Sequence, residues 1–275
     1  MCLHYDVLSD SETSRKYFNV AKSIGERFVA ESTAQARRFD PSEFSSMIVC
    51  SRLLVLLGFA FYRTHRTNGV PLSDAGAWTW LHLLRGVNTV YAAIAQSNVE
   101  LDPLLSANMI PELPQHRSSD ERTTACLHSF RHSDVFRIVS TSRHERIREL
   151  YTCLSTRSLS FNAEAMNDLQ TAIVSLEEVT TYICAGEVQS LFRAIGTWPG
   201  SVSNGFTNML LKNEPFALTI YAHWLMLVAL ARDMWWFDDM ESAGIQEVAA
   251  ILSNCDQSLL PLLEWPVKIV EVLDN

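Results

Sequence analysis

The sequence has few basic side chains and no paired cysteines. Its 22 lysine and arginine residues stand against 31 aspartate and glutamate residues, a formal net charge of -9 over 275 residues. A surface of that sign repels phosphate backbones and anionic membranes, so direct binding to nucleic acid is not expected. The six cysteines are scattered along the chain with no C-x-x-C pair. Their spacing argues against a zinc ribbon, a dithiol redox motif or a secreted disulfide framework, and a reducing compartment fits best.

The sequence also lacks the common catalytic motifs. It has no G-x-S-x-G elbow, no Gly-rich phosphate loop and no H-E-x-x-H, so the hydrolase, nucleotide-binding and metalloprotease classes lose their usual support. His128 and His132 have metal-ligand spacing, but a solvated helix explains them better. The Asp238 to Glu241 acids resemble an aspartate-rich magnesium motif, yet an acidic helix N-terminus explains them more simply. No catalytic residue, metal site or cofactor is predicted.

Neither a signal peptide nor a membrane span is indicated. Residues Met1 to Ser14 carry three acids and no apolar core behind a basic start. The longest uncharged stretch, Pro215 to Ala231, contains His223 and several other polar side chains. It is shorter than the stretch of about 20 residues that a span needs. We therefore interpret it as a fully buried helix at the centre of a helical bundle, and we expect no transmembrane segment.

Apolar residues recur at steps of three and four, with no sustained period-two alternation, which predicts an all-α fold. We expect one large multi-helix domain over residues 1–275 with a central buried helix. No internal repeat at a fixed period is visible, and residues 102–119, which hold three prolines, predict a long connection or hinge.

The pattern also predicts individual elements. Helices are expected in the segments Tyr17 to Phe28, Pro41 to His65, Trp80 to Ile94, Asn162 to Ala185, Glu187 to Ile195, Met240 to Asn254 and Trp265 to Leu273. The apolar residues of the first of these helices form one stripe, and its Tyr17 to Ala21 part resembles a domain interior. Gly196, Pro199, Gly200 and Gly205 predict loops. Arg85 is expected to be buried and paired with an acid.

Aromatic and sulfur side chains gather in the last third of the chain, which holds five of the seven tryptophans. Such a set is typical of a core, and the alternative is a pocket for a large apolar ligand with one or two polar anchors. The candidate ligand-binding residues are Tyr221, His223, Trp224, Met226, Trp235 and Trp236. The Tyr221/Trp224 and His223/Met226 pairs point in different directions on a helix, so some of the six must face the core.

Five segments together resemble a known family. They are Trp80 to Val87, Asn213 to Leu218, Tyr221 to Trp224, Trp235-Trp236 and Leu263 to Pro266. Their order resembles the signature of fungal-specific transcription factors of the sterol-uptake control type. That pattern has a Trp-x-x-Leu-Leu-Arg-Gly segment, a Pro-x-Ala-Leu segment, an Ala-His-aromatic step, a paired Trp and a terminal Trp-Pro.

The resemblance implies an α-helical regulatory domain with a hydrophobic pocket in its C-terminal half, which binds ergosterol in some members. It further implies localisation in the nucleus and the cytoplasm, with sterol occupancy keeping the factor out of the nucleus. DNA contacts in the family come from a six-cysteine zinc cluster, which this sequence does not contain. The expected partners are therefore a sterol-like molecule and proteins, either of the transcription machinery or a full-length relative.

Three functional hypotheses follow, and they leave open whether the protein is an enzyme. The first is a transcriptional regulator that senses a sterol-like or other hydrophobic ligand and controls sterol or secondary-metabolite genes through partners. The alternative is a biosynthetic cyclase or isomerase of secondary metabolism, in which His223, His82 or the Asp238/Asp239 pair would supply acid-base chemistry. The third hypothesis is an interaction protein, for example one that binds a full-length relative.

Overall fold

The computed structural model describes residues 134–185, 188–231 and 240–274, together with residues 20, 23, 27, 78, 81 and 85. Within these residues every regular element is a helix, which confirms the all-α prediction. The α-helices are α6 (Asp134–Thr156), α7 (Ala163–Ala185), α8 (Val188–Ser201), α9 (Asn204–Leu211), α10 (Pro215–Ala229), α11 (Met240–Cys255) and α12 (Glu264–Asp274). Two 3₁₀ helices, η4 (Ser158–Ser160) and η5 (Gln257–Leu263), join α6 to α7 and α11 to α12.

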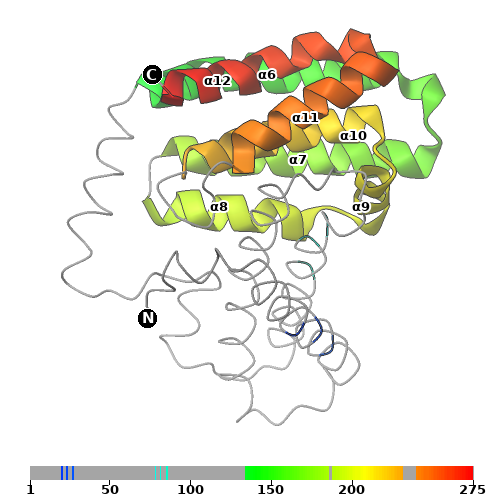
Figure 1. Cartoon of the computed structure of the whole chain (residues 1–275), viewed down its shortest axis with the longest axis horizontal. Coiled ribbons are helices and arrows are strands. Elements are labelled where there is room, and N and C mark those ends of the chain that lie inside the picture. The colour runs from blue at the N-terminus through cyan, green and yellow to red at the C-terminus, as the bar shows by residue number, and fades with distance from the viewer. Residues whose placement is uncertain are drawn as a thin grey trace.

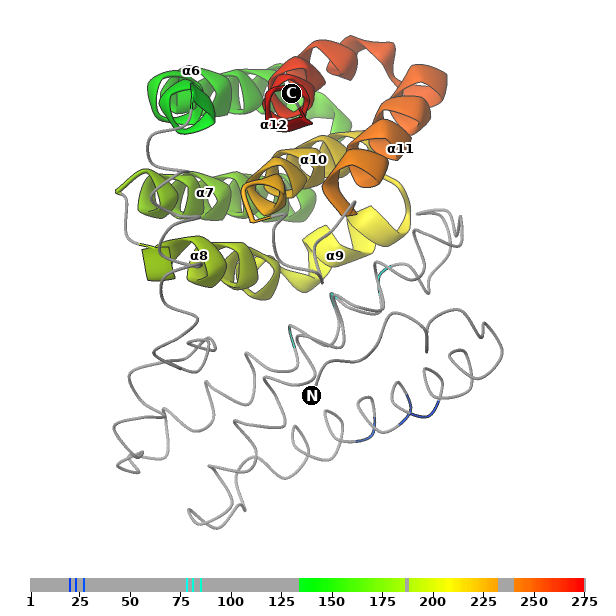
Figure 2. The ribbon, with the colours of Figure 1, turned by 60° about the vertical axis from the view of Figure 1, so that its left-hand side comes forward.

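Helix α10 lies at the centre of this assembly. Figures 1 and 2 show α6 and α12 side by side on one side of it, with α8 and α9 on the opposite side and α7 and α11 flanking it. It contacts α7, α8, α9, α11, α12 and η5, and every residue from Phe216 to Ala229 is buried. The predicted central buried helix is therefore present, and its apolar composition serves packing on all sides.

The start of α10 follows from three consecutive residues. Asn213 lies two residues after the end of α9 and has a φ of 52°. This is a left-handed conformation that asparagine tolerates better than most residues. Glu214 caps α10, because its Oε2 accepts a 2.6 Å hydrogen bond from the backbone N–H of Ala217. Pro215 occupies the first turn, where its missing N–H leaves no hydrogen bond unmade.

The prediction of loops at Gly196, Pro199, Gly200 and Gly205 is wrong. The first three lie inside α8 and the last lies inside α9. Pro199 removes one intrahelical donor, but a side chain from α10 replaces it, as the next subsection describes. Gly205 lies close to α7 rather than in a turn, and a Cβ there would overlap the carboxylate of Asp168, which would have to move.

Before α6 the structure describes six residues, at positions 20, 23, 27, 78, 81 and 85. Val20, Ser23 and Arg27 are helical and exposed, and Val20 is 50% exposed. The expectation that the Tyr17 to Ala21 stripe is interior is wrong at Val20, because Val20 shares a helical face with the polar Ser23 and Arg27. Trp78 and Leu81 are buried, whereas Arg85 is partly buried.

Several predictions fall outside the described residues. These are the helix over Pro41 to His65, the 102–119 connection, His82, the His128/His132 pair and the Asp238/Asp239 pair. Among the helices that are described, none combines the length and the apolar character needed to cross a membrane.

Candidate functional site

One face of α10 carries a cluster of aromatic rings. Tyr221 and Trp224 are stacked with ring centroids 5.7 Å apart, and Trp224 stacks in turn on Trp198 of α8 at 5.6 Å. Trp78 meets Tyr221 edge-on at 5.0 Å, and Phe206 of α9 meets Trp198 edge-on at 5.7 Å. All five side chains are at most 1% exposed. This aromatic face joins α10 to α8, α9 and the segment around Trp78.

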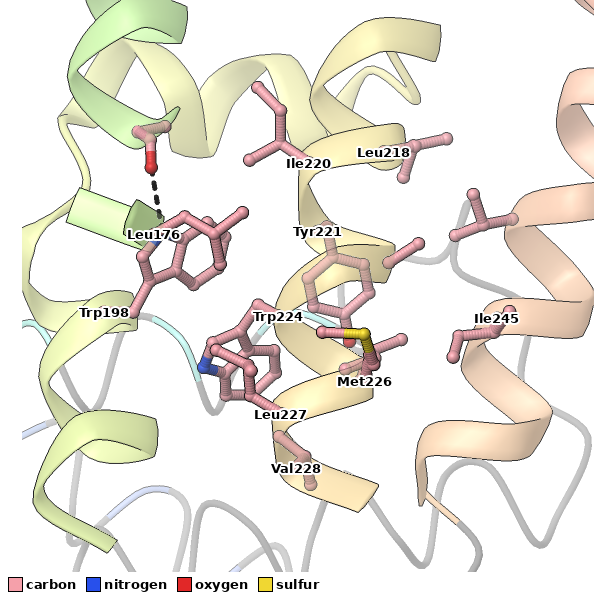
Figure 3. Packing of buried hydrophobic residues seen from close by; sticks show 14 of the residues in the cluster. Leu176, Trp198, Leu218, Ile220, Tyr221, Trp224, Met226, Leu227, Val228 and Ile245 are labelled. Atoms are coloured by element: carbon pink, nitrogen blue, oxygen red, sulfur yellow. Dashed lines mark hydrogen bonds between the residues drawn. The ribbon is translucent and has the colours of Figure 1, made fainter. Parts of the chain in front are cut away.

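The indole N–H groups of Trp198 and Trp224 on this face are paired with the backbone. Trp198 Nε1 donates to the carbonyl oxygen of Ala172 on α7 at 3.0 Å (Figure 3). Trp224 Nε1 donates to the carbonyl oxygen of Ile195 on α8, also at 3.0 Å. Ile195 precedes Pro199 by four residues, so its carbonyl would otherwise lack the usual helical donor. Trp224 thus compensates for the proline inside α8 and fixes the two helices together.

A second face of α10, the polar face, carries His223. Its ring lies 5.7 Å from that of Trp265 on α12, tilted by 52°. His223 Nδ1 lies 2.8 Å from the carbonyl oxygen of Thr219 on the preceding turn. Trp265 is 4% exposed, and its Nε1 is buried with no hydrogen-bond partner among the residues that the structure describes. The polar face therefore contrasts with the aromatic face, because a buried indole donor is left unpaired.

Electrostatics keep His223 neutral near pH 7. The pKa of His223 is lowered to about 4, chiefly by burial; the hydrogen bond to Thr219 opposes the shift, and the positive charge of Arg146 contributes to it. Arg146 lies on α6 and pairs through NH1 with both carboxylate oxygens of Glu149 at 3.0 Å. Its Nε is buried and has no partner. An unpaired indole donor of α12 thus lies on a ring next to a neutral imidazole.

The structure separates the candidate ligand-binding residues instead of gathering them. Tyr221 and Trp224 belong to the aromatic face and His223 to the polar face, and Figure 3 shows Tyr221, Trp224 and Met226 on α10. All four are buried in α10. The expectation that the two pairs point in different directions is confirmed, and their role in ligand binding stays a prediction. Trp235 and Trp236 lie outside the described residues.

Three residues of these faces did not figure among the candidates. The spacing of Trp78, Leu81 and Arg85 places them on one helical face. The expected helix over Trp80 to Ile94 began after Trp78, so Trp78 was not considered. Trp265 stands in the terminal Trp-Pro pair but gives no sign in sequence of which side chain it meets. Arg146 lies in an arginine-rich stretch typical of a solvated surface, and only the folded structure shows that its charge acts on the pKa of His223.

Arg85 is hydrogen-bonded to α9 and to the N-cap residue of that helix. Its NH1 donates to Thr207 Oγ1 at 2.8 Å and to the carbonyl oxygen of Ser203 at 3.3 Å. Ser203 is the N-cap of α9, where its hydroxyl accepts from the N–H of Phe206. Partial burial lowers the pKa of Arg85. The acidic partner expected for Arg85 stays a prediction, since the bonds described go to neutral oxygens.

Across the described residues no three histidine, cysteine or carboxylate side chains come together in a way that could hold a metal ion. Comparison of the chain with protein-family models, with curated proteins and with solved structures gives no match. The geometry around α10 is therefore the basis for any assignment of function.

Proposed function

We propose that this chain is a regulatory domain that senses a sterol-like or other hydrophobic small molecule. It would act on the transcription of sterol or secondary-metabolite genes through protein partners, in the nucleus and the cytoplasm. One observation carries the proposal: segments that resemble the family signature, far apart in sequence, meet around α10. Arg85, with Trp78 just before its segment, and Trp265 near the other end of the chain pack against α9 and α10.

The surroundings of α10 suit a hydrophobic ligand. Flat aromatic rings and an adaptable thioether offer dispersion contacts to a polycyclic molecule, and His223 with Trp265 offers polar contacts. The aromatic rings now pack on one another, so entry of a ligand on that face would separate stacked pairs worth about 0.5–1.5 kcal/mol each. A domain whose core must rearrange to admit its ligand couples binding to a change of shape, as a sensor requires.

The catalytic alternative gains no support from His223. A general base is most effective when its pKa lies near the working pH. The pKa of His223 is about 4, and its side chain is 1% exposed. Its one described hydrogen bond goes to a backbone carbonyl of its own helix. We therefore assign His223 a binding or structural role.

Ligand sensing is tested by titrating the purified chain with ergosterol in detergent while following tryptophan fluorescence and melting temperature. Binding at one hundred times the dissociation constant should add roughly 2.7 kcal/mol to the free energy of unfolding. Because Trp224 lies on α10 and Trp198 and Trp265 contact rings of that helix, their emission should change in parallel. If neither signal responds to ergosterol or to other polycyclic lipids, the sensing role is refuted.

Regulation is tested separately from binding. Fusion of the chain to an unrelated DNA-binding domain should give a reporter whose output rises when sterol is depleted. Deleting the gene should lower transcripts of sterol or secondary-metabolite genes. Unchanged transcripts with an accumulated biosynthetic intermediate would instead support the enzyme. Size-exclusion chromatography with a full-length relative tests the protein partner, and separate elution would exclude that complex.

A further inference from the structure

The polar face of α10 presents an unpaired hydrogen-bond donor in the interior. Trp265 Nε1 is shielded from solvent and lacks a partner, although leaving a buried donor unpaired is costly. Trp198 and Trp224 on the aromatic face show that this fold can pair an indole N–H with a backbone carbonyl. The unpaired indole of Trp265 therefore marks a place where a further hydrogen-bonding group is expected.

His223 supplies the complementary acceptor beside this donor. The carbonyl of Thr219 can only accept, so Nδ1 of His223 must carry the ring proton that the 2.8 Å bond uses. A neutral imidazole with its proton on Nδ1 has a lone pair on Nε2. Nε2 is thus an acceptor on a ring that lies 5.7 Å from the indole of Trp265.

We propose that His223 and Trp265 form a hydroxyl-binding site that holds the alcohol group of a hydrophobic ligand. A hydroxyl donates one hydrogen bond and accepts up to two, so it can donate to Nε2 and accept from the indole N–H together. The proposal rests on the ligand-sensing function above and specifies the chemistry of its ligand.

Other polar groups fit the pair less well. A ketone or an ether oxygen accepts from Trp265 but leaves Nε2 without a donor. A carboxylate has the same defect and adds a buried charge. The positive charge of Arg146 does not call for an anion, because Glu149 already pairs with it at 3.0 Å. Among these groups only an alcohol satisfies both rings.

The test compares two probes that differ in a single donor, ergosterol and its 3-O-methyl ether. The dissociation constant of each is measured by tryptophan fluorescence with the full chain. We expect the unchanged protein to bind the alcohol roughly tenfold to a hundredfold more tightly, since the ether has no proton to donate to His223 Nε2. His223→Phe should remove this preference. His223→Gln, whose amide both donates and accepts, should retain most of it.

Further variants separate this site from general loss of fold. Trp265→Phe should weaken both probes alike, because both accept from the indole. Tyr182→Phe, at an exposed aromatic side chain of α7, should leave the affinities for both probes and their ratio unchanged. Binding of both probes without discrimination, or a ratio that survives His223→Phe, would overturn the hydroxyl site while leaving ligand sensing intact. If neither probe binds, the proposed function itself fails and this site with it.

Discussion

The aromatic and polar faces of α10 both contain buried tryptophan, but the indole N–H groups differ in whether they are hydrogen-bonded. On the aromatic face the indoles of Trp198 and Trp224 donate to backbone carbonyls of α7 and α8. On the polar face the indole of Trp265 is buried without a partner, next to a neutral histidine. The difference teaches that burial alone does not identify a binding residue. A side chain whose hydrogen bonds are all made within the fold has a structural task, whereas an unpaired one is available to a ligand.

The largest effect is expected for Trp224→Phe. The change removes the donor to Ile195, leaves that carbonyl unpaired beside Pro199, and reduces the volume of a buried side chain. Together these terms should lower the free energy of unfolding by about 3 kcal/mol, measured by urea denaturation.

Pro199→Ala provides the matched control for this loss. An alanine at that position restores a backbone N–H four residues after Ile195, so α8 supplies the missing hydrogen bond itself. In the Pro199→Ala background, Trp224→Phe should be less damaging by about 1–2 kcal/mol. Strict additivity of the two changes would show that Trp224 does not replace the donor that Pro199 lacks.

The next effect tests the polar face through its pH dependence. In the unfolded chain His223 has its ordinary pKa of 6.5, and in the fold the value is about 4. Between these values the unfolded state binds a proton that the folded state refuses, so stability falls as the pH falls from 6.5 to 4. The loss attributable to His223 should reach about 3 kcal/mol, seen by urea denaturation at several pH values.

His223→Gln should flatten this part of the profile, and two other groups serve as internal references. The pKa of Asp256 is lowered to about 2, chiefly by Arg157, so its contribution is lost at lower pH, between 3.8 and 2. Burial raises the pKa of Glu214, which opposes the histidine by favouring the fold on acidification above pH 4.5. An unchanged slope in the variant would mean that His223 is not held neutral by the fold.

A smaller effect on stability is expected at the contact between α9 and α7. In Gly205→Ala the new Cβ overlaps the carboxylate of Asp168, which must move away from the start of α9. The loss of stability should be about 1 kcal/mol, since the higher helix propensity of alanine offsets part of the strain. With Asp168→Ala in place the strain is gone, and Gly205→Ala should then stabilise the protein by up to about 1 kcal/mol. Thermal melting of the four proteins decides between a steric effect and a conformational one.

Periodicity and capping residues were sufficient to predict most of the described helices and the central position of α10. Where the sequence failed, long-range contacts were responsible. Gly196, Pro199 and Gly200 are helix breakers by local rules, yet α8 continues through them, and Trp224 on α10 supplies the donor that Pro199 removes. Helix propensity is estimated from neighbouring residues in the sequence, so it does not include a hydrogen-bond donor that lies on another helix.

The candidate site was less predictable for a related reason. The sequence placed Tyr221, His223, Trp224 and Met226 on one helix and indicated that they diverge. It did not show that Trp224 is already hydrogen-bonded or that Trp265, on a different helix from His223, lies against the imidazole ring. Composition reveals how many tryptophans a region has, and only the packed fold shows which indole N–H groups are paired.

The smallest effect is expected for Trp265→Phe, and it is the most direct test of the contrast between the two faces. This change also shortens a buried aromatic side chain, but it breaks no hydrogen bond, because Trp265 Nε1 has no partner in the described structure. Removing an unpaired buried donor is favourable and should offset most of the lost packing, so the free energy of unfolding should change by less than about 1 kcal/mol. Urea denaturation of Trp265→Phe beside Trp224→Phe measures the difference directly. Equal losses would mean that a bound water or another group already satisfies Trp265, and that the polar face is as complete as the aromatic one.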